Sequence, residues 1–175
     1  MMKKLFWLPV LFLLFVACSS NDDDAEFTGN EVTLTLIPGN VQGNPTTGIL
    51  NIRERKDGKA QIEIELNGVL QNATHPVHLH YGSLADNGNV ATMLNPVVET
   101  SGIGKSSTIL NMLANGETLT YEQLLVFNGS IKIHFEADGQ MKDQILGSAN
   151  IGMNAPDNSV YLEGIKSIAV CNSNY

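Results

Sequence analysis

The sequence predicts an all-β domain, a β-sandwich or a β-barrel, on three observations. Short runs in which apolar and polar residues alternate recur along the chain, as expected of strands that bury one face. The 16 Gly, with many Asn and Asp, separate these runs as turn residues do. The pair Asp57-Gly58 stands between two of the runs, and this pair is a strong signal for a β-hairpin.

Each expected element follows from its local pattern. The run at residues 60–66 alternates most cleanly, so Ile62, Ile64 and Leu66 are predicted to face the core. Thr120 and Gln123 form a capping-box pattern, which predicts a short helical turn within residues 118–125. Strands are expected at residues 32–37, 48–54, 60–66, 77–81, 107–110, 130–136, 145–153 and 159–162, and a further one at 165–170. Residues 31–175 suit one domain by length.

The N-terminal segment predicts a lipid-anchored protein. Residues 1–17 begin with two lysines and continue as an apolar run that is too short to span a bilayer, which is typical of a signal peptide. Residues 15–18, Phe-Val-Ala-Cys, resemble a bacterial lipobox, in which Cys18 is acylated and becomes the mature N-terminus. The alternative is an ordinary secreted protein that is cleaved near residue 17.

The segment after this cysteine predicts a flexible tether. Residues 18–30 begin with a polar, acidic stretch, and that stretch resembles the surface-export signal of Bacteroidota lipoproteins. We therefore expect a cell-envelope protein, anchored in the outer membrane through the lipid on Cys18 and exposed at the surface. Its protein partner, if it has one, cannot be named from the sequence.

Charge and cysteine content exclude several roles. With 10 basic against 18 acidic residues the chain has a net charge of −8, which disfavours binding to nucleic acid or to anionic lipid. Of the 2 Cys, the anchor uses Cys18, so no internal disulfide is expected. The remaining Cys171 follows an apolar run, and this setting is more typical of a small buried hydrophobe than of a reactive thiol.

The histidines are the candidate site. In residues 77–81 the alternation places His78 and His80 on one face and the apolar residues on the other, and in residues 130–136 it places His134 on the outer face. The Cβ atoms of His78 and His80 are then roughly 6–7 Å apart, so both rings can turn toward one ion. We expect three solvent-reachable imidazoles, a ligand type that suits copper, zinc, iron and nickel. The alternative is that these are ordinary surface histidines that bind no metal. Sequence spacing alone does not establish that the strand with His134 lies next to the strand with His78 and His80.

These segments resemble a known family. Residues 68–82, in which a glycine leads into His75-Pro-Val-His78-Leu-His80, resemble the His-x-x-His-x-His segment of Cu,Zn superoxide dismutases. Residues 130–139 resemble their later strand that carries a copper ligand, and residues 145–152 are similar to their closing strand. The same features resemble the CHRD (chordin-type) domain. The resemblance covers about residues 31–153 and implies a Greek-key β-sandwich or barrel of the superoxide dismutase/CHRD type.

The resemblance implies roles for individual residues, and the sequence also departs from the dismutase pattern at several positions. It implies that His78, His80 and His134 are copper ligands and that His75 is a structural residue bonded to the backbone. Met93 occupies the position of the metal-bridging histidine, and no further histidine remains to build a zinc site. The two arginines lie on an early strand, so the arginine that guides superoxide is missing.

Three functional hypotheses follow. The first is a non-dismutase domain that binds one transition-metal ion, with copper favoured and zinc not excluded, through His78, His80 and His134. The second is a CHRD-like binding or scaffold module without metal, and the third is a weak copper-only dismutase. The departures argue against an efficient enzyme. A thioether from Met93 would suit Cu(I), although a methionine between apolar residues is more often a core filler.

Overall fold

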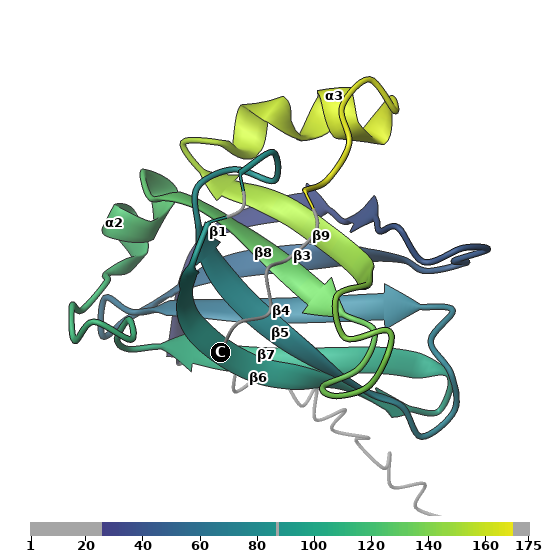
Figure 1. Ribbon diagram of the computed structural model, residues 1–175. Coiled ribbons are helices and arrows are strands. Elements are labelled where there is room, and N and C mark those ends of the chain that lie inside the picture. The colour runs from purple at the N-terminus through teal and green to yellow at the C-terminus, as the bar shows by residue number, and fades with distance from the viewer. Residues whose placement is uncertain (1–25, 87, 170–175) are drawn as a thin grey trace, which may run out of the picture.

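The computed structural model describes residues 26–86 and 88–169, and these form an almost entirely β structure (Figure 1). The predicted signal peptide, Cys18 and Cys171 lie outside the described residues. Within the described part, no helix has the length and apolar character needed to cross a bilayer. The elements are β1 (Phe27–Thr35), β2 (Ile37–Pro38), β3 (Thr47–Arg55), β4 (Ala60–Asn67), β5 (Thr74–Tyr81), β6 (Val90–Thr100), β7 (Ile103–Leu110), α2 (Tyr121–Leu125), β8 (Asn128–His134), β9 (Ile145–Gly152), η1 (Ala155–Asp157) and α3 (Asn158–Leu162).

The strands form one antiparallel sheet with Greek-key connections. Their order is β1-β3-β4-β7-β6-β5-β8-β9-β2. β4 precedes β5 in the chain but pairs with β7, and β8 follows β7 in the chain but pairs with β5. Three hairpin-connected strands flanked in this way are a Greek key. The predicted all-β class and the Greek-key barrel or sandwich architecture are therefore confirmed.

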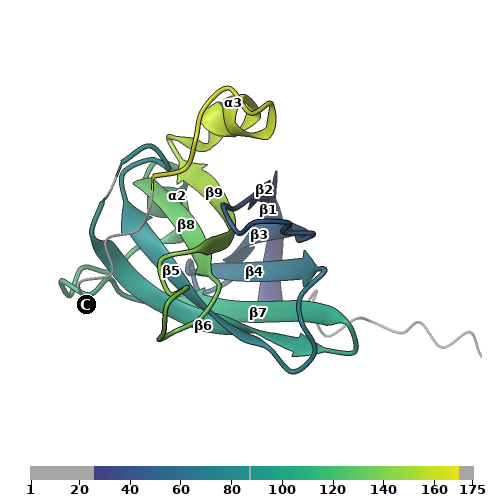
Figure 2. The same cartoon turned by 45° about the vertical axis from the view of Figure 1, so that its right-hand side comes forward.

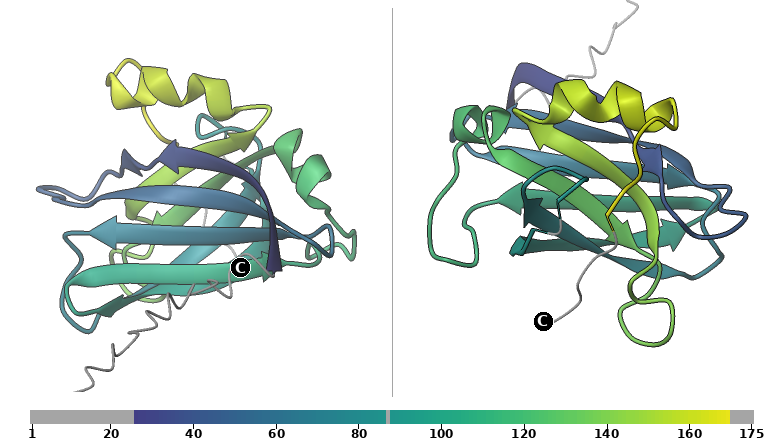
Figure 3. Two further views of the ribbon diagram at one scale, coloured as in Figure 1. Left: turned by 180° about the vertical axis from the view of Figure 1, so that it is seen from behind. Right: turned by 45° about the horizontal axis from the view of Figure 1, so that its top comes forward.

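The sheet curls into two layers with the core between them (Figures 2 and 3). Seen from behind, β1, β3, β4 and β7 lie in front, and β5, β8 and β9 cross behind them (Figure 3). The inward residues of both layers are buried, among them Ile62, Ile64 and Leu66 as predicted. Burial of a side chain of this size stabilises the fold by roughly 1.5–3 kcal/mol. The alternating strands thus present one face to the core.

Two local predictions are confirmed in detail. β3 and β4 form the expected hairpin, and Gly58 in its turn has a φ of +80°, a conformation that L-residues with a side chain rarely adopt. At α2, the amide of Gln123 donates to the Thr120 hydroxyl over 3.2 Å, and the amide of Thr120 donates to the Gln123 side chain over 2.9 Å. This is the capping box that the sequence indicated.

Four expectations about the elements need correction. β6 was not expected, because Asn95-Pro96 interrupts its alternation. The strand predicted at 159–162 is instead the helix α3, which follows a 3₁₀ turn that contains a proline, and residues 165–169 form no strand. β1 starts at Phe27, so the last four residues of the predicted tether belong to the sheet.

The C-terminal part of the chain covers the outer face of β8 and β9. The Asn158 side chain accepts from the Asn150 amide over 2.8 Å and donates to the Asn150 carbonyl over 3.0 Å. Further along, the Ala169 amide donates to the Leu84 carbonyl over 2.8 Å, and the Lys132 ammonium donates to the Ala169 carbonyl over 3.1 Å. The segment after α3 therefore returns across the sheet (Figure 1), and this outer face does not lie open to solvent.

Candidate metal centre

β5 and β8 bring the histidines together because they are neighbours in the sheet. Val77 lies opposite Ile133, and His78 lies opposite Lys132. Val77 and Ile133 point into the core, so the alternation turns His78 to the opposite face. His134 is two residues beyond Lys132 on the same strand and shares that face. The pairing of β5 with β8, which sequence spacing alone does not establish, therefore places His134 on the same face as His78.

Three imidazoles converge on this face. The ring centroids of His78 and His134 are 4.6 Å apart, those of His78 and His80 5.9 Å, and those of His80 and His134 6.4 Å. One potential ligand nitrogen from each lies within 4.8 Å of the other two. An ion with metal–nitrogen bonds of about 2.0–2.1 Å holds its nitrogens roughly 3.3–4 Å apart. Small ring rotations would close the remaining gap, so the three side chains fit one metal ion.

Backbone carbonyls fix the orientation of two of these rings. His80 Nδ1 lies 2.9 Å from the Gly88 carbonyl, and His134 Nδ1 lies 2.9 Å from the Lys142 carbonyl. A carbonyl can only accept, so Nδ1 carries the proton in both rings and Nε2 carries the lone pair. Nε2 of His134 is buried and makes no hydrogen bond with any described residue. Metal-binding histidines are commonly oriented by such a bond from their second nitrogen.

Burial keeps the cluster neutral. His78, His80 and His134 are only 3%, 4% and 2% exposed, which corrects the expectation of solvent-facing rings. Desolvation, reinforced by the neighbouring histidines, lowers the pKa of His78 to about 3. Desolvation also lowers the pKa of His80 to about 4, against the Gly88 hydrogen bond, and it lowers the pKa of His134. All three rings are therefore neutral at pH 7, as a histidine must be to bind a metal.

A small cavity lies beside two of the three histidines. It has a volume of about 110 Å³, and its lining includes His78, His134, Met93, Glu136 and Lys142. Met93 is 61% exposed, so the interpretation as a core filler is wrong.

His75 has the structural role that the resemblance implied. Its ring is buried, and Nδ1 lies 2.8 Å from the carbonyl oxygen of Phe135, the residue that directly follows β8. It does not belong to the three-histidine group. His75 therefore braces the backbone beside the cluster.

Lys132 is a residue of this site that the sequence argument did not single out. Its side chain is 1% exposed, and its ammonium donates to the Ala169 carbonyl. Its positive charge lowers the pKa of both His80 and His134, after the larger effect of their burial. Alternation placed Lys132 on the histidine face, but its burial depends on the distant C-terminal segment.

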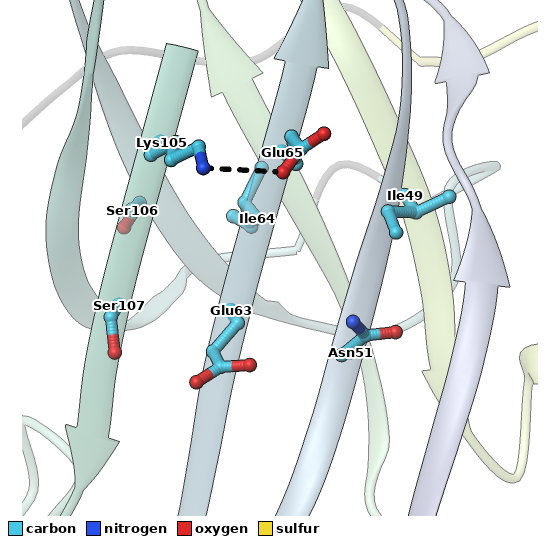
Figure 4. Close-up of a pocket in the computed structure, with 8 residues that line it drawn as sticks. All are labelled: Ile49, Asn51, Glu63, Ile64, Glu65, Lys105, Ser106 and Ser107. Carbon is cyan, nitrogen blue, oxygen red and sulfur yellow. Dashed lines mark ion pairs between the residues drawn. The ribbon is translucent and has the colours of Figure 1, made fainter. Parts of the chain in front are cut away.

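A larger groove lies on the other layer and carries no comparable chemistry. Figure 4 shows it over β3, β4 and β7, with an ion pair of 3.6 Å between Lys105 and Glu65. Its volume is about 350 Å³, and it is lined by alternating outer-face residues such as Asn51, Glu63 and Ser107. The acidic groups there are spread along the strands rather than converging. Of the groups of three or more potential metal ligands sought in the described residues, the histidine cluster is the one found.

Comparison with known proteins assigns no family. A scan of the chain against protein-family models finds no match, and a search of curated proteins finds no significant match either. The superoxide dismutase/CHRD resemblance therefore stays a prediction based on the quoted residues, whereas the fold class and the histidine cluster rest on the structure.

Proposed function

We propose that this protein is a cell-envelope lipoprotein of the superoxide dismutase/CHRD type that binds one transition-metal ion, with copper favoured, through His78, His80 and His134. The observation that carries the metal proposal is the convergence of three buried, neutral imidazoles from two paired strands. The anchor at Cys18 and the envelope location rest on the sequence pattern alone.

The donor set supports a transition metal over a hard cation. Imidazole nitrogen is a ligand for copper, zinc, iron and nickel, whereas calcium and magnesium require oxygen ligands. Among divalent ions of the first transition row, copper binds nitrogen sites most tightly. Copper is therefore the favoured ion, and zinc is the alternative to test beside it.

The proposal excludes efficient superoxide dismutation. All four histidines of the chain are accounted for by the cluster and by His75, so none remains to bridge to a second metal. The two arginines, Arg53 and Arg55, lie on β3 and form ion pairs with carboxylates of the neighbouring strands and turn. With a net charge of −8, the protein would also repel an anionic substrate.

Metal analysis tests this proposal. Protein stripped with a chelator, then equilibrated with copper or zinc and desalted, is expected to retain one equivalent of metal. His134→Ala removes one of three ligands and should lower the affinity by at least about 100-fold. His75→Gln is the matched control, because it changes a buried histidine outside the cluster and should keep the full equivalent. The metal-to-protein ratio by mass spectrometry is the measurement, and circular dichroism verifies folding.

Two outcomes would contradict the proposal. Failure of the folded wild-type protein to retain either metal would leave the binding or scaffold module as the better hypothesis. Unchanged binding by a folded His134→Ala variant would show that any metal sits elsewhere.

A further inference from the structure

We propose that Met93 is a fourth ligand of the metal centre and that the ion it selects is Cu(I). This inference rests on the proposed function, because it names the oxidation state and the additional donor of the same site. Three independent observations carry it: the register of β5 and β6, the shared cavity, and the charge balance around the histidines.

The register places Met93 beside His78. The two residues are direct partners across the antiparallel pair of β5 and β6. Direct partners project to the same face, with Cβ atoms about 4.5–5.5 Å apart. A methionine side chain has three rotatable bonds, so its sulfur can reach an ion held by the neighbouring ring.

The cavity places Met93 in one space with two of the three histidines. Met93, His78 and His134 all line the pocket of about 110 Å³. Because Met93 is 61% exposed and the histidines are buried, the thioether lies on the solvent side of the imidazoles. An ion bound by the three rings would have this sulfur as a donor on its open side.

The charge balance favours a monovalent ion. Three neutral imidazoles and a thioether contribute no negative charge. The buried Lys132 places a positive charge near His80 and His134, and the Asp143 carboxylate acts on His134 in the opposite direction with a smaller effect. Burial of a divalent ion there would cost more than burial of a monovalent one. Soft thioether donors also select Cu(I).

Glu136 is the competing fourth donor. Its carboxylate contributes to the lining of the same cavity and would favour a divalent ion. One of its oxygens, however, already accepts the Met141 amide over 2.6 Å, within the turn that follows β8. Among the hydrogen bonds of the described residues, none involves the Met93 side chain.

A competition experiment separates these donors. Wild-type protein, Met93→Leu and Glu136→Gln are titrated with Cu(I) against a chromophoric Cu(I) chelator without oxygen, and with Zn(II) against a zinc chelator. We expect Met93→Leu to lose about tenfold or more in Cu(I) affinity and to keep its Zn(II) affinity. Met112→Leu is the matched control, since Met112 is similarly exposed, at 53%, but lies outside the cavity. X-ray absorption of the Cu(I) forms should show a sulfur ligand except in Met93→Leu.

The outcomes distinguish this inference from the proposed function. If the wild-type protein binds neither Cu(I) nor Zn(II), the proposed metal site itself is wrong. If it binds Cu(I) with the same affinity as Met93→Leu and without a sulfur ligand, the site stands and Met93 is not part of it. Loss of affinity in Glu136→Gln but not in Met93→Leu would assign the fourth position to the carboxylate.

Discussion

The buried ammonium of Lys132 lies near the three histidines that are proposed to bind a metal cation. It lies opposite His78 and two residues before His134, and it is buried, so solvent screens it little. Within the described residues, its side-chain ammonium donates to a backbone carbonyl rather than to a carboxylate. A buried charge of this kind is retained at a cost to stability, and it acts on any ion nearby.

Removal of this charge should tighten metal binding. Lys132→Met keeps the length of the side chain and removes the repulsion, so the affinity for divalent copper or zinc is expected to rise by at least about tenfold. Competition titration measures the change. Lys105→Met, on the opposite layer, should leave the affinity unaltered. A folded Lys132→Met variant with weaker or equal affinity would show that the ammonium does not oppose the ion.

The loop between β5 and β6 orients one of the candidate ligands, His80. The Gly88 carbonyl accepts from His80 Nδ1, and a Cβ built at Gly88 would lie 1.7 Å from the Tyr81 carbonyl oxygen. Glycine is therefore required for this close approach of two backbone segments. The loop thus fixes the orientation of the His80 ring by a hydrogen bond, and β5 fixes the position of its backbone.

Gly88→Ala should consequently disturb the site without touching a ligand. The added methyl group displaces the loop and its carbonyl, and loss of such an orienting bond typically lowers metal affinity 10- to 100-fold. A metal titration with a thermal melt provides the measurement. Gly147→Ala, where an added Cβ meets nothing nearer than 3.7 Å, is the control and should bind normally. Equal affinities of the two variants would argue against the orienting role.

Local sequence patterns predicted most of the strands, but not which strands pair or which outward-facing side chains are buried. The alternation in β5 and β8 placed His78, His80 and His134 on the faces opposite the core, and this is confirmed by the burial of Val77 and Ile133. Whether β5 pairs with β8 is a long-range property that no local pattern contains. The burial of the histidines and of Lys132 depends on contacts with segments distant in sequence. The Lys132 ammonium, for example, donates to the carbonyl of Ala169 in the C-terminal segment, which also forms a helix where β-prone residues suggested a strand.

At the scale of the whole molecule, the histidines couple folding to pH. Their pKa values in the folded protein are lowered, to about 3 for His78 and about 4 for His80, from about 6.5 in the unfolded chain. Well above pH 6.5 these histidines are neutral in both the folded and the unfolded state, so their titration contributes nothing to stability. As the pH falls below that value, the unfolded chain takes up protons that the folded protein does not, and the folded state loses stability.

The free energy of unfolding of the metal-free protein should therefore fall between pH about 6.5 and about 4. Each affected histidine contributes up to about 1.4 kcal/mol per pH unit. Urea denaturation at several pH values in the presence of a chelator measures the slope. His78→Gln should reduce it, since glutamine does not titrate. A slope that is identical in the variant would mean that His78 does not carry the effect.

The pairing of β5 with β8 has a consequence for the amount of folded protein in the cell. His80 and His134 come together only when these strands pair, so an ion held between them binds the folded chain and not the unfolded one. By mass action such an ion adds about 2.7 kcal/mol of stability when its free concentration is a hundred times its dissociation constant. Starvation for the metal would then leave a larger unfolded fraction open to proteases. The abundance of this protein at steady state would follow the supply of its ion.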